Sequence, residues 1–462
     1  MSSKMLPKSS SLIQPNLFYG TLRDMLDMND SLIALANAIE WKNIEDSLSK
    51  FYDPINGRPA KPIRLMAGLL MLKQLENLSD ENVVLQWKRN PYYQYFCGMH
   101  DYQAALPCDS TELVKFRNRI GSVGIDAIFG ASVALHPEAA EEERVIIDTT
   151  AHEKNITYPT DGKLAIKIIN RLHKIAKREG IPLRRTYIKE IKGHRITLRF
   201  FRHPKKRSKA VVAMKRLRTI AKILIRDLDR HFDDKQHKQY AEEFYLFMRV
   251  LLQKRTSRNK VYSLHESHIY AMAKGKDNKS YEYGTKASVV STYTHGIIVG
   301  VAAHDINQHD SKTLETALGH AHTKRTTSIT EAVCDRGYRG TKQVGETTIS
   351  IPGIHLKRDT EEQKEDKRAK FRRRAAVEPI IGHIKHDHRM ARNYLKGFVG
   401  DQINLLMAAC AWNLKKWMNI FIHALFFTLR YCLLIAYTDH LIQQWKLSRG
   451  FSRKKALAHF WN

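Results

Sequence analysis

A basic stretch between residues 163 and 260 separates the first predicted β-strand of this chain from the later ones. It carries 30 lysines and arginines against 8 aspartates and glutamates, an excess of 22 positive charges out of a net charge of +30 for all 462 residues. Its apolar spacing predicts helices over 164–178, 209–231 and 236–254. A solvated helix face normally mixes charges of both signs, so this imbalance favours contact with the phosphates of a nucleic acid. An anionic membrane surface or ribosomal RNA is the rival partner.

The sequence on either side of the basic stretch predicts a sheet. Val145–Thr150 is apolar and β-branched, as expected of a buried central strand. Further strands are predicted over 286–293, 296–303, 329–335 and 348–351. A long helix-favouring segment rich in lysine and arginine begins near Glu361. This order predicts an α/β protein in which helices cover a mixed sheet and the basic helices form an insertion after the first strand.

Residues 18–140 have a helical pattern. Ile63–Leu75 is apolar nearly all round, which predicts a buried helix. Ser79 is a predicted N-cap, and Asp109 with Glu112 three residues later predicts a capping box. The helix that this box opens carries three cations, Lys115, Arg117 and Arg119.

Three domains are predicted from these changes in pattern. A helical domain over residues 1–140 would bind DNA or make dimer contacts, with an ordinary helical bundle as the alternative. A catalytic domain would follow over residues 141–400, with the insertion at about 163–260. Residues 401–462 would form a C-terminal helical tail.

The tail contains an apolar segment, Trp417–Thr438, that is long enough to raise the question of a membrane span. Arg430 would lie deep in the bilayer at a cost of about 3 kcal/mol. A buried or partner-facing helix is therefore predicted, and no membrane is expected. The first 15 residues lack the apolar core of a signal peptide, and the five scattered cysteines indicate reduced thiols. Both features predict a cytoplasmic protein.

Three acids fall where a metal site can form. Asp148 and Asp335 lie at the ends of predicted strands, and Glu378 lies in the late helical segment. Carboxylates at neighbouring strand ends share the crevice in which open α/β sheets bind ligands. Such oxygen ligands suit Mg²⁺ or Mn²⁺. Two ions about 4 Å apart would activate a water or a 3′-hydroxyl and stabilise the leaving oxygen of a phosphoryl displacement.

Other acids compete for these roles. Asp161, beside Thr160, is predicted to belong to a helix cap, and Asp310 is predicted to cap the next helix. Asp305 is a further rival. Helical periodicity alone does not choose among these acids.

The surroundings of Glu378 favour it. Arg374 precedes it by four residues and Lys385 follows it by seven, which predicts one shared helical face. Arg374 could hold a phosphate through two hydrogen bonds, and Lys385 would act as a point charge. Pro379 would break a continuous helix or start a fresh one.

These residues also resemble a known signature. Phe371, Arg374, Glu378 and Lys385 have the spacing of the Tyr-x2-Arg-x3-Glu-x6-Lys signature of bacterial insertion-sequence transposases, with Phe371 in place of the tyrosine. The surrounding sequence resembles the insertion-sequence-five family. Matching segments are Arg58–Gly68, Gln94–Gly98, Leu106–Asp109, Asp148–Thr150, Cys334–Tyr338, Glu378–Lys385 and Asn393–Gly397.

The resemblance implies a ribonuclease-H-like core that cuts DNA at terminal inverted repeats and transfers the strand into target DNA, using Mg²⁺ with Mn²⁺ as a substitute. It implies that Asp148, Asp335 and Glu378 bind the metal and catalyse the reaction. Arg374, Lys385 and Arg336 would bind double-stranded DNA, and the enzyme would work as a homo-oligomer in the nucleoid. The alternatives are an inert transposase-derived DNA-binding protein and a nuclease that lacks strand transfer.

Overall fold

The structure, a computed structural model, describes residues 4–6, 20–254, 256–276, 279–353 and 358–458. The predicted lack of a signal peptide in the first 15 residues therefore falls almost entirely outside the described residues. The chain divides into two compact units. The first comprises Met1–Glu141 with Met407–Asn462, and the second comprises Glu142–Leu406.

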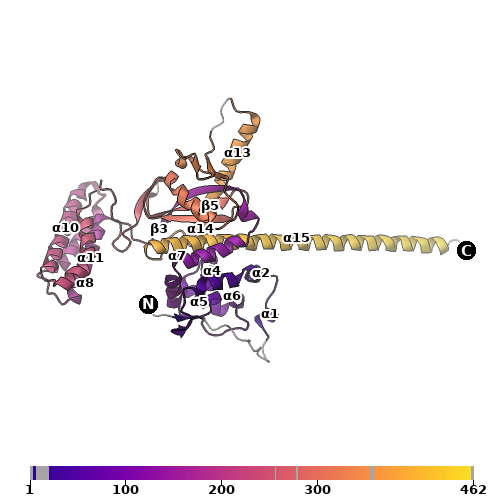
Figure 1. Ribbon diagram of the computed structural model, residues 1–462, viewed down its shortest axis with the longest axis horizontal. Coiled ribbons are helices and arrows are strands. Elements are labelled where there is room, and N and C mark those ends of the chain that lie inside the picture. Colours follow the sequence, from indigo (N-terminus) through magenta and orange to yellow (C-terminus); the bar gives the residue numbers. More distant parts are fainter. Residues whose placement is uncertain (1–3, 7–19, 255, 277–278, 354–357, 459–462) are drawn as a thin grey trace. The chain divides into compact units, whose positions relative to one another are not determined.

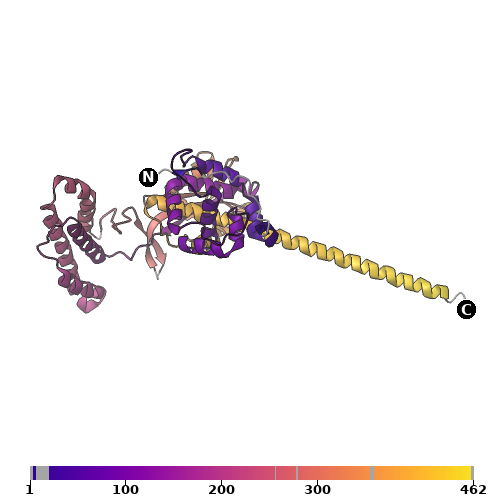
Figure 2. The ribbon, with the colours of Figure 1, turned by 90° about the horizontal axis from the view of Figure 1, so that it is seen from below.

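The N-terminal part of the first unit is a cluster of helices (Figure 2). They are α1 (Leu22–Met25), α2 (Ser31–Ala38), α3 (Trp41–Ser49), α4 (Ile63–Leu75), α5 (Asp80–Arg89), α6 (Pro91–Phe96) and α7 (Ser110–Ala134). Two short strands, β1 (Lys4–Met5) and β2 (Arg58–Pro59), pair in parallel. Helix α4 is buried on nearly all sides, as predicted. The predicted N-cap at Ser79 and capping box at Asp109 are also confirmed.

Helix α7 bends at Gly121, whose φ of 57° is a left-handed conformation that glycine adopts without strain. Before the bend, Arg117 is buried and makes two hydrogen bonds of 2.8 and 2.6 Å to Asp80 of α5. Burial would raise the pKa of Asp80, but Arg117 and Lys73 outweigh it and lower the pKa to about 2. Arg117 therefore joins two helices, and the predicted basic helix presents fewer cations than its sequence indicates.

The second unit contains a mixed sheet (Figure 1), which confirms the predicted α/β class. Its strands are β3 (Arg144–Glu153), β4 (Tyr270–Lys276), β5 (Lys279–Thr292), β6 (Ile298–His304), β7 (Glu331–Val333), β8 (Gln343–Val344) and β9 (Thr347–Ser350). The order is β4-β5-β3-β7-β9-β8, and β6 also pairs with β5. Strands β3, β7 and β9 are parallel to one another, while β5 is antiparallel to β3, β4 and β6.

Helices cover both faces of the sheet. On β3, Ile146 packs against Val377 and Ile381 of α14 (Val377–His386). The neighbouring residue Ile147 faces the other side because strand side chains alternate. On that side Gly300 of β6 lies so close to α12 (Leu314–His322) that a Cβ atom would stand 2.9 Å from the Cα of Ala321. The predicted helix near Glu361 is α13 (Glu361–Ala375).

The basic insertion lies between β3 and β4 and has its own apolar core (Figure 1). It consists of α8 (Asp161–Arg178), α9 (Ile188–Thr197), α10 (Arg207–Asp229) and α11 (Asp234–Leu252). The three predicted helices are confirmed. Helix α9 has no counterpart among them, because its apolar residues do not share one face and only Ile191 is buried.

Helix α15 (Gly397–Ala458) contains the apolar segment of the tail. Phe427 and Leu433 are 75% and 70% exposed, so the prediction of a buried helix is wrong for these described residues. A partner-facing helix remains the prediction. By length and composition alone, residues Gly397–Leu441 could cross a membrane.

Candidate active site at the ends of strands β3 and β7

Asp148 and Asp335 lie at the same level along two neighbouring parallel strands, β3 and β7. Ile146 and Val333 form the last pair between β3 and β7, and Asp148 and Asp335 each follow by two residues. Residues two apart in an extended chain share a face, and neighbouring strands run about 4.8 Å apart. The prediction that Asp148 ends its strand is wrong, because β3 continues against β5 to Glu153. Strand β7, in contrast, stops at Val333, two residues before Asp335.

Glu378 reaches the same region from α14, which packs on the Asp148 face of β3. Arg374, in the last turn of α13, donates to Glu378 with Nη2 to Oε1 at 3.1 Å. A break at Ala376 separates the two helices, and Pro379 lies in the first turn of the new one, where no backbone donor is lost. The side chain of Glu378 is 63% exposed, so its carboxylate remains open to solvent and ligands.

Lys385 lies on α14 about two turns beyond Glu378, a distance of roughly 10 Å along the helix. It lies near His152, close to the C-terminal end of β3. Burial is the main cause that lowers the pKa of His152 to about 4, and the charges of Lys154 and Lys385 add to the effect. The structure therefore brings Arg374 to the carboxylates but leaves Lys385 farther along the same helix.

Electrostatics indicate that the predicted acids lie close together. Burial raises the pKa of Asp148 to about 6, and the charges of Asp335 and Glu378 add to the increase. The backbone N–H of Thr149 and the charge of Arg374 oppose it. Asp335 is oriented by its own turn, since its Oδ1 accepts a hydrogen bond from the Gly337 N–H at 2.8 Å.

A fourth acid, Asp310, was assigned to a helix cap from the sequence, and this assignment is wrong. His309 is the cap, and Asp310 is the first residue of a short 3-10 helix, Asp310–Thr313. Its Oδ1 accepts hydrogen bonds from Lys286 Nζ at 2.7 Å and from Thr149 Oγ1 at 3.0 Å. No local pattern in the sequence marks this role, because sheet topology brings Asp310 to Thr149.

The other rival acids lie elsewhere. Thr160 caps α8, as its sequence predicts, while Asp161 forms an ion pair of 2.7 Å with Arg218 inside the insertion. Asp305 is exposed in the segment after β6.

The chemistry of the clustered acids fits a divalent cation. All four carboxylates offer hard oxygen ligands, the kind that Mg²⁺ and Mn²⁺ prefer. A bound cation would relieve the repulsion that raises the pKa of Asp148. Within the described ranges, however, no three His, Cys, Asp or Glu side chains are already placed to hold an ion between them. Ligand placement would therefore require side-chain movement.

Basic residues line a pocket next to these acids. Arg336, which directly follows Asp335, lines it together with residues of α13. Phe371, the residue in place of the signature tyrosine, is 58% exposed there. Three further cations in the lining are Lys367, Arg368 and Arg372. The pocket suits a phosphate group beside an apolar surface.

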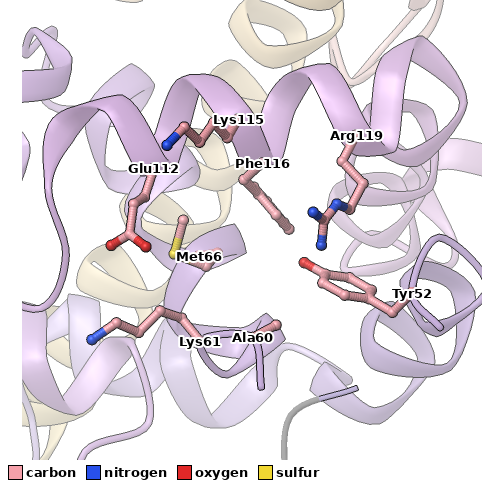
Figure 3. A pocket seen from close by; sticks show the side chains of 8 residues that line it. All are labelled: Tyr52, Ala60, Lys61, Met66, Glu112, Lys115, Phe116 and Arg119. Atoms are coloured by element: carbon pink, nitrogen blue, oxygen red, sulfur yellow. The ribbon is translucent and has the colours of Figure 1, made fainter. Parts of the chain in front are cut away.

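The N-terminal unit has its own basic pocket (Figure 3). Lys61, Lys115 and Arg119 bring three cations to its lining, against one acid, Glu112. The guanidinium of Arg119 lies over the ring of Tyr52, with its carbon 4.9 Å from the ring centroid. This positive balance suits an anionic group such as a phosphate.

Comparisons with known proteins agree with these features. The family described as Transposase domain (DUF772) matches residues 20–119, and the family described as Transposase DDE domain matches residues 221–414. A Rhizobium meliloti protein described as "Uncharacterized protein ORF8 in nfe locus" is 38% identical over 204 residues, which cover 43% of this chain and 98% of that protein. No solved structure matches the chain.

The matched transposase domains, together with the α/β fold and the acids where β7 ends beside β3, define a transposase. The chain belongs to the DDE transposase family. Asp335 and Glu378 fall inside the DDE match, while Asp148 lies between the two matched segments. The assignment of Asp148 therefore depends on the geometry of β3.

Replacing Asp148 by asparagine is expected to stabilise the metal-free protein. The native pKa of about 6 exceeds the ordinary aspartate pKa of 3.8, so the native state binds the proton more tightly and its stability falls as the pH rises between these values. At about pH 7.5 the variant should gain on the order of 1–3 kcal/mol in free energy of unfolding, and below about pH 4 the gain should vanish. Denaturant unfolding in EDTA, with the exposed Asp46→Asn as the control, measures the difference. Equal stability at neutral pH would contradict the buried, repelled carboxylate.

Proposed function

We propose that this transposase cuts double-stranded DNA at the ends of its mobile element and joins the released strand to target DNA, using Mg²⁺ or Mn²⁺. The proposal depends chiefly on the acids where β7 ends beside the middle of β3, because Asp335 and Glu378 help to raise the pKa of Asp148 there. We assign Asp148, Asp335 and Glu378 to metal binding and catalysis. The alternation of parallel and antiparallel strands around β3 is compatible with a ribonuclease-H-like core.

Each side chain has a distinct part in this proposal. Divalent cations held here would activate the attacking oxygen and stabilise the leaving oxygen. Asp335 presents its carboxylate in an orientation fixed by the Gly337 N–H. Arg374 holds Glu378 through Nη2, and the rest of its guanidinium would donate to a DNA phosphate beside the acids.

DNA contacts would extend beyond the acids. Arg336 and the neighbouring α13 cations would hold phosphates near the cut, with Lys385 farther along α14. The insertion would follow the DNA backbone, and the pocket of Lys115 and Arg119 would contribute to binding of the element end. Because cleavage must be coordinated at two ends, we expect a homo-oligomer, for which α15 offers exposed apolar side chains. A cytoplasmic, nucleoid-associated location would follow from these contacts.

The direct test is cleavage and strand transfer on labelled DNA taken from both flanks of the gene. Joined products that need Mg²⁺ and a free 3′-hydroxyl would support the proposal. Cuts without joining would indicate a nuclease. Tight DNA binding without any cut, under conditions in which a related transposase is active, would indicate an inert DNA-binding protein.

DNA affinity is expected to fall steeply with salt. If the insertion neutralises about six phosphates, affinity should drop on the order of 10³-fold between 50 and 200 mM salt, because bound counterions are released. Changing the exposed Lys205, Lys209 and Lys215 of the α10 region to glutamine should reduce the log–log slope by about 0.9 for each lost phosphate contact. Fluorescence anisotropy measures the slope. The matched control changes the same lysines to arginine, and a slope unaffected by charge removal would contradict insertion–DNA contact.

A further inference from the structure

The sheet has a second face where β7 ends beside β3, and none of the three assigned acids comes from an element on that face. Thr149 follows Asp148 on β3 and faces the opposite side of the sheet, the side that α12 covers. The 3-10 helix beginning at Asp310 leads directly into α12. Asp310 therefore approaches the edge from the opposite face to Glu378.

The two oxygens of Asp310 have different surroundings. All the side-chain hydrogen bonds described for Asp310 use Oδ1, which accepts from Lys286 and Thr149. Lys286 is itself fixed, because its Nζ also donates to the Gln308 carbonyl at 2.6 Å. Oδ1 is thus anchored on a cation and a hydroxyl, which sets the direction in which Oδ2 points.

Oδ2 of Asp310 and Oδ1 of Asp335 both border Gly337. A Cβ atom on Gly337 would stand 2.9 Å from Asp335 Oδ1 and 3.0 Å from Asp310 Oδ2, so the two oxygens share the space that glycine leaves open. Two carboxylate oxygens placed in this way repel each other unless a cation or a proton lies with them. Lys286 contacts Asp310 through Oδ1, which leaves Oδ2 as the oxygen available to a cation.

Tyr338 provides an independent observation at the same place. It is fully buried, and in the part of the chain that the structure describes its hydroxyl makes no hydrogen bond of regular geometry, with Thr149 as its nearest partner. Asp148, Thr149 and Asp310 all lie close enough to influence its pKa. A buried donor of this kind is available to a group that binds between the carboxylates.

From this geometry we propose that Asp310 is a fourth metal-binding carboxylate, which offers Oδ2 to the same divalent cation as Asp335. Lys286 and Thr149 orient it through Oδ1. The inference rests on the proposed metal-dependent function and extends it. The acids of the site then come from both faces of the sheet, with Asp335 between Asp148 and Asp310.

The test is Mn²⁺ binding, followed by electron paramagnetic resonance on the full chain without DNA, together with the Mg²⁺-induced rise in Tm. Asp310→Asn keeps an oxygen for Lys286 and Thr149 but loses the charge, and it should weaken Mn²⁺ binding at least tenfold. Gly337→Ala keeps every charge but places a methyl between the two oxygens, and it should weaken binding as well. Asp305→Asn, an exposed acid nearby, is the control and should bind as the wild type does.

The outcomes separate the two proposals. Wild-type affinity in both Asp310→Asn and Gly337→Ala, with binding lost in Asp335→Asn, would overturn the role of Asp310 and leave the proposed function standing. No Mn²⁺ binding by the wild type would overturn both. If Asp310→Asn does not fold, wild-type affinity in Gly337→Ala alone would overturn the role of Asp310.

Discussion

Asp335→Asn is expected to abolish DNA cleavage and strand transfer while DNA affinity changes by less than about threefold. The substitution keeps the shape of the side chain and the acceptor for the Gly337 N–H, but it removes the charge that would bind the cation. Metal-ion catalysis supplies several kcal/mol, and each 1.36 kcal/mol is a factor of ten in rate, so the loss should be on the order of 10³-fold or more. Labelled DNA ends, assayed for cut and joined products with Mg²⁺, measure the rate.

Glu378→Gln should have the same outcome, because the other member of its ion pair, Arg374, would still have a hydrogen-bond acceptor. Asp305→Asn is the matched control and should retain full activity. If Asp335→Asn or Glu378→Gln lost DNA binding and thermal stability together with cleavage, these acids would support the fold and have no separate catalytic role. Residual cleavage within tenfold of the wild type would exclude Asp335 from metal binding.

The sequence predicted the elements whose signals are local. Helices α4 and α5 were predicted because apolar spacing and an N-cap mark them, and the strand containing Asp148 because it is β-branched and buried. Strand β4 was not predicted, since its sequence Tyr270–Lys276 alternates weakly and its pairing with β5 depends on residues that follow it in the chain.

The same distinction between local and long-range signals applies to the contacts of the candidate site. Arg374 and Glu378 are four residues apart, so helical geometry alone predicts their contact. Asp310 and Thr149 are brought together by sheet topology, which no local pattern encodes. The exposed apolar side chains of α15 exclude the predicted burial within the chain and leave the predicted partner-facing helix, because apolar composition favours burial without indicating which partner provides it.

No local pattern in the sequence predicts the buried ion cluster that follows Glu153, the last residue of β3. Lys154 lies 2.5 Å from Asp401 and 3.4 Å from Glu266, and all three side chains are nearly inaccessible to solvent. His268 and Asn393 make hydrogen bonds of 2.9 and 2.6 Å to Asp401. Burial acts to raise the pKa of Asp401, but His268 and Lys154 outweigh it, so the pKa is lowered. The cluster joins β3 to the first turns of α15.

Lys154→Met is expected to destabilise the second unit by about 3–5 kcal/mol at neutral pH, because it leaves two buried carboxylates without their main cation. The deficit should shrink at low pH. In the wild type the lowered pKa of Asp401 contributes stability that is lost as the pH falls through it, whereas the variant gains when its carboxylates are protonated. Unfolding followed at about pH 7.5 and pH 4, with the exposed Lys215→Met as the control, measures both effects. A deficit below about 1 kcal/mol at neutral pH would mean that solvent reaches the cluster and that other contacts, such as the backbone hydrogen bonds of Asn393 to Glu153 and Asn155, hold this end of β3.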